Sequence, residues 1–313
     1  MDDQEEFLIS YCNLKSGLFN YQRNFLDKKK LNLFYDNEDM GFPICLPANI
    51  KYFNYNKANF FKINVNEFSK KIFNTCDLNY TGNKKFFRYG NLFASNVYLK
   101  SKYLNKYNFY KKNILRIRKE VSKIKNNYKN VCAMQIRNVP HFGHEAVFKF
   151  LLKKFDIVVL NPIFGIKKKN DFSDKEISKA LKYMEEKYPR IKFIPVWSNF
   201  HYAGPREAIH HMFLRENLNF DYFYVGRDHA GSQNIYKPNM ASNLVNKNKD
   251  KFKIKSITSK GGYFCKDCKK YLIKGNCKHK NLLNISGTEF RKFLSEKRVY
   301  IHADSKVQKI IHR

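Results

Sequence analysis

The amino-acid sequence predicts an α/β protein with a parallel central sheet, preceded by a mostly β region and followed by a small cysteine-rich region. Between residues 131 and 225, short β-branched runs alternate with stretches of helical periodicity. The residues before this part hold short aromatic and β-branched runs broken by Asn, Gly and Pro, and three of the seven cysteines fall between residues 265 and 277. We therefore divide the 313 residues into units of residues 1–122, 123–259 and 260–313.

The first unit is expected to be mostly β. Its clearest runs are Phe42-Pro43-Ile44-Cys45-Leu46-Pro47 and Phe60-Phe61-Lys62-Ile63-Asn64-Val65. Towards its end, apolar residues recur at positions 114, 117, 121 and 124, which is helical spacing. A helix should therefore lead into the second unit.

Four strands and three helices are expected in the second unit. The strands are predicted at residues 131–135, 156–163, 191–197 and 222–225, and the helices at 144–155, 173–187 and 205–217. Ser173 with Glu176 three residues later is typical of a capping box, and Pro205 suits the first turn of a helix. Strands separated by helices run parallel and are joined by right-handed crossovers.

Polar segments follow each of these strands. Ligands of such sheets bind beyond the carboxyl ends of the strands, so these segments are candidates for one site. Arg, His, Asn and Gly are frequent in them, and these residues supply the donors and the close backbone approach that a polyphosphate needs. The segments are Gln135-Ile136-Arg137-Asn138 with the residues up to Glu145, then Asn161-Pro162, then Ala203-Gly204-Pro205-Arg206-Glu207, then Gly226-Arg227-Asp228-His229-Ala230-Gly231. A structural ion pair at a helix start is the alternative for Arg206 and Glu207.

The formal net charge of +33 suggests nucleic acid, an anionic membrane or small anionic substrates as partners. The lysines occur in short dispersed runs, however, so the charge alone decides little. No apolar run approaches the roughly 20 residues that span a bilayer, and the acidic start lacks the features of a signal peptide. We expect a cytoplasmic protein with neither membrane nor nucleic acid as a partner.

Two short motifs point to phosphate chemistry. His141-Phe142-Gly143-His144 places two histidines on one face at a helix start, and it resembles the H-x-G-H signature of the nucleotidyltransferases. Ile285-Ser286-Gly287-Thr288-Glu289-Phe290-Arg291 resembles the I-S-[SG]-T-x-x-R element of the same superfamily. A helix cap at Ser286 or Thr288 explains the second motif equally well.

The cysteine-rich region has metal-ligand spacing. Cys265 and Cys268 are followed by Cys277 and His279, and three thiolates with one imidazole can complete a tetrahedral zinc site. Four protein ligands leave no open position, so such a zinc would be structural. Free reduced thiols are the alternative.

The motifs together resemble the ATP sulfurylase family. Gln135-Ile136-Arg137-Asn138 with the following histidines is similar to the family's Q-[TL]-R-N-P-x-H-x-x-H element, Asn161-Pro162-Ile163-Phe164-Gly165 to its N-P-L-x-G turn, and the segments 202–208 and 226–231 to two further elements. The resemblance runs from about residue 110 to the end. It is weak in the first unit, where Lys15-Ser16-Gly17-Leu18-Phe19 and Phe42-Pro43-Ile44 only faintly match the family's PUA-like β domain.

Two positions depart from the family pattern. Ile136 replaces Thr or Leu, which should matter little if this position contributes its backbone. The proline after Asn has moved one place to give Val139-Pro140, so the loop before His141 should follow a different path.

The resemblance implies a Rossmann-like nucleotidyltransferase domain between a PUA-like domain and a zinc-knuckle and helical region, and it implies adenylyl transfer from ATP to sulfate. Catalytic roles would fall to Ile136, Arg137, Asn138, His141 and His144. ATP would contact Gln135, Arg137, Asn138, His141, His144, Gly226, Arg227, Asp228, His229, Ser286, Thr288 and Arg291. Sulfate would lie against Gln135, Arg137 and the backbone of Ala230. Mg²⁺ would arrive with ATP, zinc would occupy Cys265, Cys268, Cys277 and His279, and the subunits would form a homo-oligomer.

Two alternatives stay open. One is an adenylyltransferase of the same superfamily with another acceptor. The other is a basic nucleic-acid-binding protein with a zinc knuckle, which explains the charge and the cysteines but not the anion-binding segments at one sheet edge.

Overall fold

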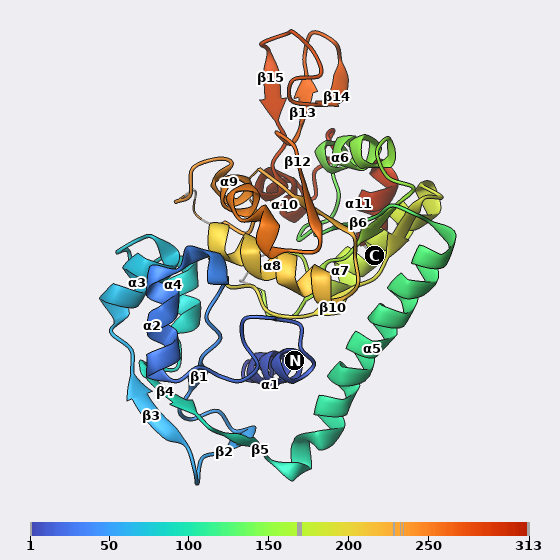
Figure 1. Ribbon diagram of the computed structural model, residues 1–313. Coiled ribbons are helices and arrows are strands. Elements are labelled where there is room, and N and C mark those ends of the chain that lie inside the picture. The colour runs from blue at the N-terminus through green and yellow to red at the C-terminus, as the bar shows by residue number, and fades with distance from the viewer. Residues whose placement is uncertain (1, 168–170, 228, 232, 234, 312–313) are drawn as a thin grey trace.

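A five-stranded parallel sheet forms the centre of the computed structural model, which describes residues 2–167, 171–227, 229–231, 233 and 235–311 (Figure 1). The strands lie in the order β12-β11-β6-β7-β9 and all pair in parallel. Their bounds are β6 Val131–Met134, β7 Ile157–Leu160, β9 Ile191–Phe193, β11 Tyr222–Val225 and β12 Lys255–Thr258. Strand β6, the first strand of this sheet along the chain, thus has neighbours on both sides, and the winding direction reverses between β6 and β11.

The side chains of each strand alternate between two hydrophobic clusters. Cys132 and Met134 of β6 pack into one cluster, whereas Val131 and Ala133 pack into the other. The first cluster lies beneath helices α6, α7, α10 and α11, and the second lies beneath α5, α8, α9 and the N-terminal elements. Both faces of the sheet are therefore covered, as parallel sheets require.

The helices around the sheet begin where the sequence provides caps. Ser173 accepts from the N–H of Glu176, whose carboxylate in turn accepts from the N–H of Ser173, so the expected capping box is confirmed. Pro205 occupies the first turn of α8. The helices are α5 Leu104–Asn127, α6 Phe142–Leu152, α7 Asp174–Lys187, α8 Pro205–Asn217, α9 Met240–Lys247, α10 Gly287–Ser295 and α11 Ser305–Ile311, with the short 3₁₀ helix η3 Lys249–Lys251.

The N-terminal region is mixed rather than mostly β, so that prediction is wrong for the described residues. Its helices span 11, 9, 9 and 6 residues, whereas no strand is longer than four. The helices are α1 Glu5–Lys15, α2 Lys28–Asp36, α3 Val65–Phe73 and α4 Thr81–Phe86, with the 3₁₀ turns η1 Glu38–Met40 and η2 Ser101–Tyr103. The strands are β1 Leu46–Pro47, β2 Phe53–Asn54, β3 Asn59–Lys62, β4 Leu92–Ser95 and β5 Tyr98–Leu99.

Local capping explains part of this difference. Asp27 and Asn64 each accept from an N–H of the third residue that follows, which starts α2 and α3. In α3, Phe68 and Ile72 are four residues apart and both are buried, so the aromatic content reflects a helix face. The observed mixture gives the PUA-like architecture no support.

The N-terminal elements share one hydrophobic core with the sheet. Leu8 and Ile9 of α1 belong to the same cluster as Val131 of β6 and Phe223 of β11. The proposed boundary at residue 122 falls inside α5, the long helix beside the sheet in Figure 1. The division into three units stays a prediction.

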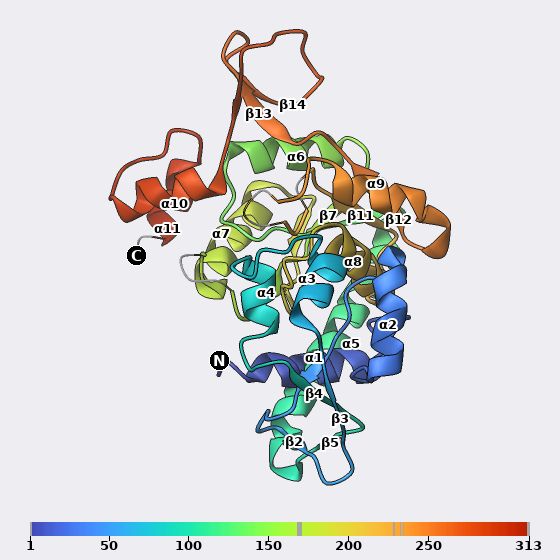
Figure 2. The same ribbon diagram turned by 90° about the vertical axis from the view of Figure 1, so that its left-hand side faces the viewer.

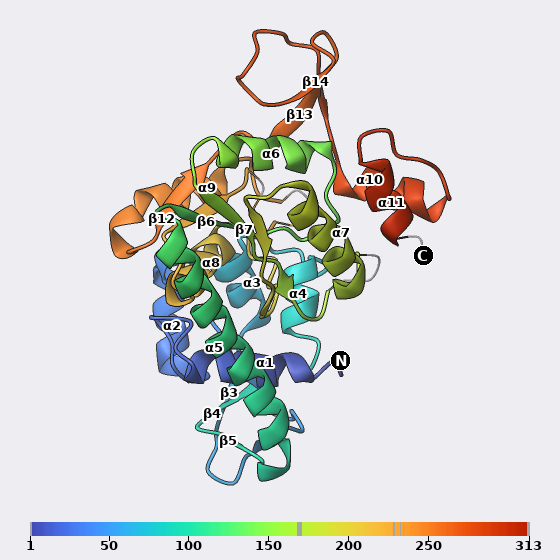
Figure 3. The same cartoon turned by 90° about the vertical axis from the view of Figure 1, so that its right-hand side faces the viewer.

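The cysteine-rich segment forms a small three-stranded antiparallel sheet in the order β14-β13-β15. Its strands are β13 Gly262–Cys265, β14 Lys270–Ile273 and β15 Leu282–Asn284. Figures 2 and 3 show it projecting from the body beyond α6, against which β13 and β14 pack, with α10 and α11 beside it.

The predicted α/β alternation is confirmed, with three differences. The run at 156–163 divides into β7, which belongs to the central sheet, and β8 Ile163–Phe164, which does not. The run at 191–197 divides into β9 and β10 Val196–Trp197, and β10 pairs with β8 in a separate two-stranded sheet. The sheet also has a fifth strand, β12, at its edge. Among the described residues, no helix combines the length and apolarity needed to cross a membrane.

Candidate functional site

A cleft of about 330 Å³ opens at the carboxyl ends of β6 and β11, where the winding of the sheet reverses. Ligands of doubly wound sheets bind at this place. The cleft is lined by Met134, Gln135, Arg137, Asn138, His141, Gly143, His144, Val147, Phe200, Tyr224, Gly226, Arg227, His229, Ala230, Gly231, Gly261, Gly262, Asn284, Ile285 and Gly287. Most of the site residues expected from the sequence thus meet here, and no Asp or Glu is among these described lining residues.

The loop after β6 separates polar from apolar side chains. Gln135 and Arg137 line the cleft, while Ile136 and Val139 are buried in the core. The Ile136 side chain therefore anchors the loop, and only its backbone remains for a catalytic role. The Gln135 Oε1 atom is buried without a hydrogen-bond partner among the described residues, and the Arg137 guanidinium lies 5.7 Å from the centre of the Tyr202 ring. Two polar groups thus face the cleft.

Asn138 joins this loop to α10. The Nη1 atom of Arg291 donates to Oδ1 of Asn138 at 2.6 Å, and Nη2 of Arg291 donates to the Thr288 hydroxyl at 3.1 Å. Arg291 Nη1 also lies 3.7 Å from the buried carboxylate of Asp171. Since Oδ1 of Asn138 is engaged, its Nδ2 is the end left to donate to a ligand.

The remaining residues of the I-S-G-T element take two different positions. Ile285 and Gly287 line the cleft, and a Cβ atom on Gly287 would stand 2.9 Å from Nδ2 of Asn138. Ser286 is the N-cap of α10 and accepts from the N–H groups of Thr288 and Glu289. Ser286, Thr288 and Arg291 do not line the cleft, so the cap interpretation of this motif is confirmed for Ser286.

The two histidines of the H-x-G-H motif lie together at the start of α6. Their ring centres are 3.9 Å apart, and the His141 N–H donates to Nδ1 of His144 at 3.3 Å. A neutral His144 therefore carries its proton on Nε2, where it can donate to a ligand. Burial lowers the pKa of His144 to about 4, and burial with the neighbouring His144 ring holds the pKa of His141 well below its usual value.

Gly143 between the histidines permits a close backbone contact. A Cβ atom on Gly143 would lie 3.0 Å from the His141 ring and 3.3 Å from the carbonyl oxygen of Gly262. A Cβ atom on Gly262 would lie only 2.1 Å from the Gly143 carbonyl oxygen. The start of β13 is thus pressed against the start of α6. Gly262 leaves no room for a Cβ atom, whereas a Cβ atom at Gly143 would require its neighbours to shift by a few tenths of an ångström.

The loop after β11 supplies the opposite wall. Gly226, Arg227, His229 and Ala230 all line the cleft, whereas Asp228 lies outside the described residues. Ala230 adopts a left-handed backbone with φ of 55°. Its carbonyl oxygen accepts from the N–H of Gly204 at 3.3 Å, which ties this loop to the segment before α8.

Two of the four expected loops do not line the cleft. Asn161 is fully buried, with Nδ2 donating to the Ile194 carbonyl and Oδ1 accepting from Arg215. Arg206 donates to the backbone carbonyls of residues 37 and 71, whereas Glu207 accepts from the N–H groups of residues 201 and 203. Arg206 and Glu207 thus have separate partners, and the ion pair between them, which was the alternative interpretation, is not observed.

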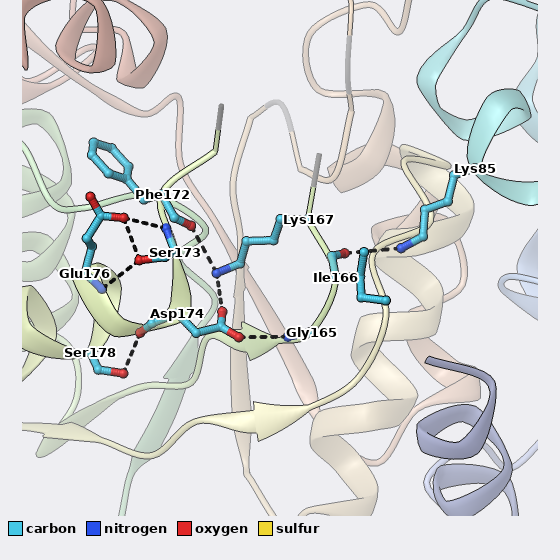
Figure 4. Close-up of polar contacts among 9 residues, drawn as sticks. All are labelled: Lys85, Gly165, Ile166, Lys167, Phe172, Ser173, Asp174, Glu176 and Ser178. Atoms are coloured by element: carbon cyan, nitrogen blue, oxygen red, sulfur yellow. Dashed lines mark hydrogen bonds and ion pairs between the residues drawn. The ribbon is translucent and has the colours of Figure 1, made fainter. Parts of the chain in front are cut away.

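The segment between β8 and α7 is held by polar contacts that Figure 4 displays. The Gly165 N–H donates to Oδ2 of Asp174 at 3.2 Å, and Lys167 pairs with the same carboxylate. Lys85 of α4 donates to the Ile166 carbonyl at 3.4 Å. The N-P-I-F-G turn is therefore fixed to α7 on one side and to the N-terminal region on the other.

The four predicted metal ligands gather on the small antiparallel sheet. One ligand atom each of Cys265, Cys268, Cys277 and His279 lies within 4.8 Å of all the others. His279 Nδ1 is 3.0 Å from the sulfur of Cys268 and 3.6 Å from that of Cys265. Three sulfurs and one imidazole nitrogen at this spacing form a possible metal site.

Seven lining positions were not expected from the sequence. They are Met134, Val147, Phe200, Tyr224, Gly261, Gly262 and Asn284. The adjacent glycines Gly261-Gly262 were the available signal, because such pairs mark places where the backbone approaches another group closely.

The strand order and the switch-point cleft define a doubly wound α/β protein with a ligand site lined by Arg, His, Asn and Gly. The family model for ATP-sulfurylase matches residues 110–300, and the chain belongs to this family.

Curated relatives carry the name sulfate adenylyltransferase. The protein of Pyrococcus abyssi is 37% identical over 237 residues, which cover 73% of this chain and 61% of the relative. The protein of Ignicoccus hospitalis is 35% identical over 235 residues, covering 72% and 60%. The chain thus spans about three fifths of the length of these relatives.

A solved structure shares the fold. It is described as the hexameric APS kinase from Thiobacillus denitrificans, with a TM-score of 0.52 and 12% sequence identity over 72% of this chain and 44% of that chain. At this identity the likeness concerns the fold alone.

Proposed function

We propose that the protein is a sulfate adenylyltransferase, which transfers the adenylyl group of ATP to sulfate and releases diphosphate. The observation that carries the proposal is the convergence of the Q-I-R-N, H-F-G-H and G-R-D-H-A-G segments on one cleft at the switch point. Relatives named sulfate adenylyltransferase that are 34–37% identical support it.

In this mechanism a sulfate oxygen attacks the α-phosphorus in line and diphosphate leaves from the opposite side. Gln135, Arg137 and the backbone of Ala230 would hold the sulfate. A half-turn of the Gln135 amide would place Nε2 where Oε1 now lies. The buried end of the side chain would then be a hydrogen-bond donor. Sulfate is a weak nucleophile, so overcoming the repulsion between two anions is the main task, and positioned donors perform it.

Hydrogen-bond donors on both walls of the cleft would bind the negatively charged phosphates. Arg137 and the Nδ2 end of Asn138 would donate to the α-phosphate. His141 and His144, held neutral by burial, would donate to the β- and γ-phosphates at the start of α6, where helix N–H groups also face the anion. Gly226, Arg227, Asp228 and His229 would contact the nucleotide, and Ser286, Thr288 and Arg291 would support the phosphates through Asn138.

Mg²⁺ would enter with ATP. The described residues of the cleft include no carboxylate, which suits an ion held by phosphate oxygens and water rather than by a protein cage. Bound Mg²⁺ would neutralise part of the charge that develops on diphosphate.

Zinc would bind Cys265, Cys268, Cys277 and His279. The soft thiolates and the four-ligand set fit a tetrahedral structural zinc, with Zn–S distances of about 2.3 Å that place the sulfurs nearly 4 Å apart. Since β13 packs on α6, the ion would hold the wall of the cleft that contains Gly262.

A homo-oligomer and a cytoplasmic location belong to the same proposal. The solved structure with the shared fold is itself described as hexameric. Sedimentation of the purified protein, giving a mass above the 37.4 kDa of one chain, tests it.

The experiment that tests the function is diphosphate release from ATP with different acceptors. We expect release only with sulfate, and not with nicotinamide mononucleotide, phosphopantetheine or a cytidylyl acceptor. Release with one of these and not with sulfate would identify an adenylyltransferase of another specificity. Salt-sensitive RNA binding without any diphosphate release would favour the nucleic-acid-binding alternative.

A further inference from the structure

A chain of three side chains leads from the buried Glu207 and His211 to the partly buried His229 at the cleft. Nδ1 of His211 lies 2.8 Å from Nε2 of His229, and Nε2 of His211 lies 3.5 Å from Oε1 of Glu207. Glu207 and His211 are fully buried on α8, one turn apart, while His229 lines the cleft. The proposed mechanism assigns no task to Glu207 or His211.

The carboxylate end of this chain is fixed by the backbone. Oε1 of Glu207 accepts from the His201 N–H and Oε2 accepts from the Ala203 N–H, both at 2.9 Å. Ala203 adjoins Gly204, whose N–H donates to the carbonyl oxygen of Ala230. The same segment therefore positions Glu207 and the proposed sulfate-binding backbone.

The protonation of Glu207 decides the direction of the hydrogen bond between the two histidines. Burial keeps both rings neutral by lowering their pKa values, so one proton lies between Nδ1 of His211 and Nε2 of His229. An ionised Glu207 attracts a proton to Nε2 of His211, which leaves Nδ1 of His211 to accept from His229. Nε2 of His211 has no hydrogen-bond partner among the described residues, so the Glu207 charge acts on it through space across 3.5 Å. Protonation of Glu207 removes this attraction, and the proton of His211 then moves to Nδ1, from which His211 donates to His229.

The other nitrogen of His229 changes with this direction. When Glu207 is ionised, Nδ1 of His229 is a bare acceptor, because the ring proton resides on Nε2. When Glu207 is protonated, Nδ1 of His229 carries the proton and becomes a donor. His229 directly precedes Ala230, whose backbone is proposed to hold the sulfate, and both residues line the cleft. Donors favour a bound anion and bare nitrogen lone pairs repel it, so the two states differ in their affinity for a sulfate group beside this ring.

We propose that Glu207, acting through His211, sets the tautomer of His229, and that binding of a sulfate group in the cleft is coupled to uptake of one proton by the Glu207 carboxylate. The inference rests on the proposed function, and Glu207 is a positioning residue in it. The proton stays on Glu207 while the protons of both histidines move along the chain, so each ring remains neutral.

The surroundings of Glu207 place the transition near neutral pH. Burial raises the pKa of Glu207 to about 7, against the hydrogen bonds from the His201 and Ala203 N–H groups. The titratable and charged groups that face it are His210, His211 and Arg215 on α8, His201 before α8, Lys85 on α4, Arg137 after β6, His229 after β11, and Tyr236. Three of them, Lys85, Arg137 and Arg215, are cations that favour the ionised form.

Calorimetry of adenylyl sulfate binding tests the coupling. This product fills the nucleotide and sulfate positions but lacks the β- and γ-phosphates. Their negative charge would favour proton uptake by His141 or His144, and that contribution is therefore avoided. If protonation strengthens binding tenfold, the pKa of Glu207 rises by about one unit and roughly 0.4 proton is taken up at pH 8. The binding enthalpy should be measured in HEPES and in Tris at pH 8, because the buffer supplies the proton. The two binding enthalpies should differ by roughly 0.4 times the difference between the ionisation enthalpies of the two buffers.

Variants separate Glu207 from other sources of protons. Glu207→Gln should abolish the buffer dependence, whereas Glu145→Gln, a buried glutamate on α6 that pairs with Lys187 outside the cleft, should retain it. If Glu207→Gln does not fold, His211→Asn decides, because an Asn amide can keep a partner for His229 while losing contact with Glu207. Affinity of the wild type should fall about fivefold between pH 7 and pH 9, because half of Glu207 is already ionised at pH 7.

The outcomes are distinct. Two outcomes would overturn the coupling and leave the proposed function standing. One is binding by the wild type without proton uptake, and the other is proton uptake by Glu207→Gln and His211→Asn equal to that of the wild type. No binding of adenylyl sulfate by the folded wild type would overturn the proposed function itself.

Discussion

Replacing Gly262 by Ala should displace the start of α6 and with it both histidines of the cleft. A Cβ atom at this position would lie 2.1 Å from the Gly143 carbonyl oxygen and 2.8 Å from its carbonyl carbon. Both of these atoms belong to backbone, so no side-chain rotation relieves the contact. The start of β13 and the start of α6 must therefore move apart.

The size of the effect follows from this overlap. Restoring an ordinary contact requires a separation of about 1 Å, and overpacking of this kind costs about 1–3 kcal/mol of stability. A displacement of about 1 Å between catalytic groups and substrate typically reduces the rate on the order of a hundredfold. We expect kcat/KM for ATP in adenylyl sulfate formation to fall by about that factor in Gly262→Ala.

The assay compares this variant with Gly261→Ala at a temperature where urea unfolding shows both to be folded. Gly261 has a φ of 78°, and a methyl group at its Cβ position would have no heavy atom within 4 Å, so alanine there strains the backbone without pushing on α6. Gly261→Ala should lose stability and keep more of its kcat/KM than Gly262→Ala. Wild-type kcat/KM in folded Gly262→Ala would refute the proposed role of this contact.

Three further predictions concern α10, the cysteine cluster and pH. Arg291→Lys loses the 2.6 Å hydrogen bond to Asn138, which should lower kcat/KM for ATP about tenfold, while Arg298→Lys on the exposed surface should not; equal rates for the two variants would contradict this role. Metal analysis should find one zinc per chain, which is lost in Cys265→Ser and kept when the exposed Cys76 is replaced by Ser. A wild-type protein that is active without bound zinc would contradict the proposed zinc site. Burial lowers the pKa of seven histidines, to about 4 for His144, so unfolding below about pH 6.5 takes up protons and the urea midpoint should fall between about pH 6.5 and pH 4. Glu207 has the opposite effect, because its raised pKa lets the folded protein bind a proton at a pH where the unfolded chain does not. It is one group against seven histidines, so the urea midpoint should still fall. A midpoint that rises as the pH falls from 6.5 to 5 would contradict this prediction.

The sheet and its helices could be predicted because their signals are local. Helix α8 begins at Pro205 and β11 occupies residues 222–225 as expected, since a helix-starting proline and a short β-branched and aromatic run each specify their own conformation. The edge strand β12 was missed because its sequence Lys-Ser-Ile-Thr has little apolar character.

Helix α1 could not be predicted in this way. Nine of the 11 residues of α1 are buried, so the helix has no polar face and no amphipathic period. Its helical conformation is stabilised by packing against the sheet cluster, which is information that lies elsewhere in the chain.

The site was predictable where one loop holds several ligand-facing residues. The loops after β6 and β11 line the cleft as expected. The link between Glu207 and His229 was not visible, because His229 lies in another loop and only the fold brings it to His211. Contacts between separate loops depend on topology, and a single sequence does not display them.

The most direct measurement is sulfate-dependent formation of adenylyl sulfate by the purified protein, with the wild type beside Arg137→Ala and the surface variant Arg116→Ala. A preorganised donor in such a site contributes about 3 kcal/mol, so Arg137→Ala should lose at least on the order of a hundredfold in rate, while Arg116→Ala should match the wild type. Adenylyl sulfate formation that proceeds at the wild-type rate without Arg137 would contradict the assignment of the cleft.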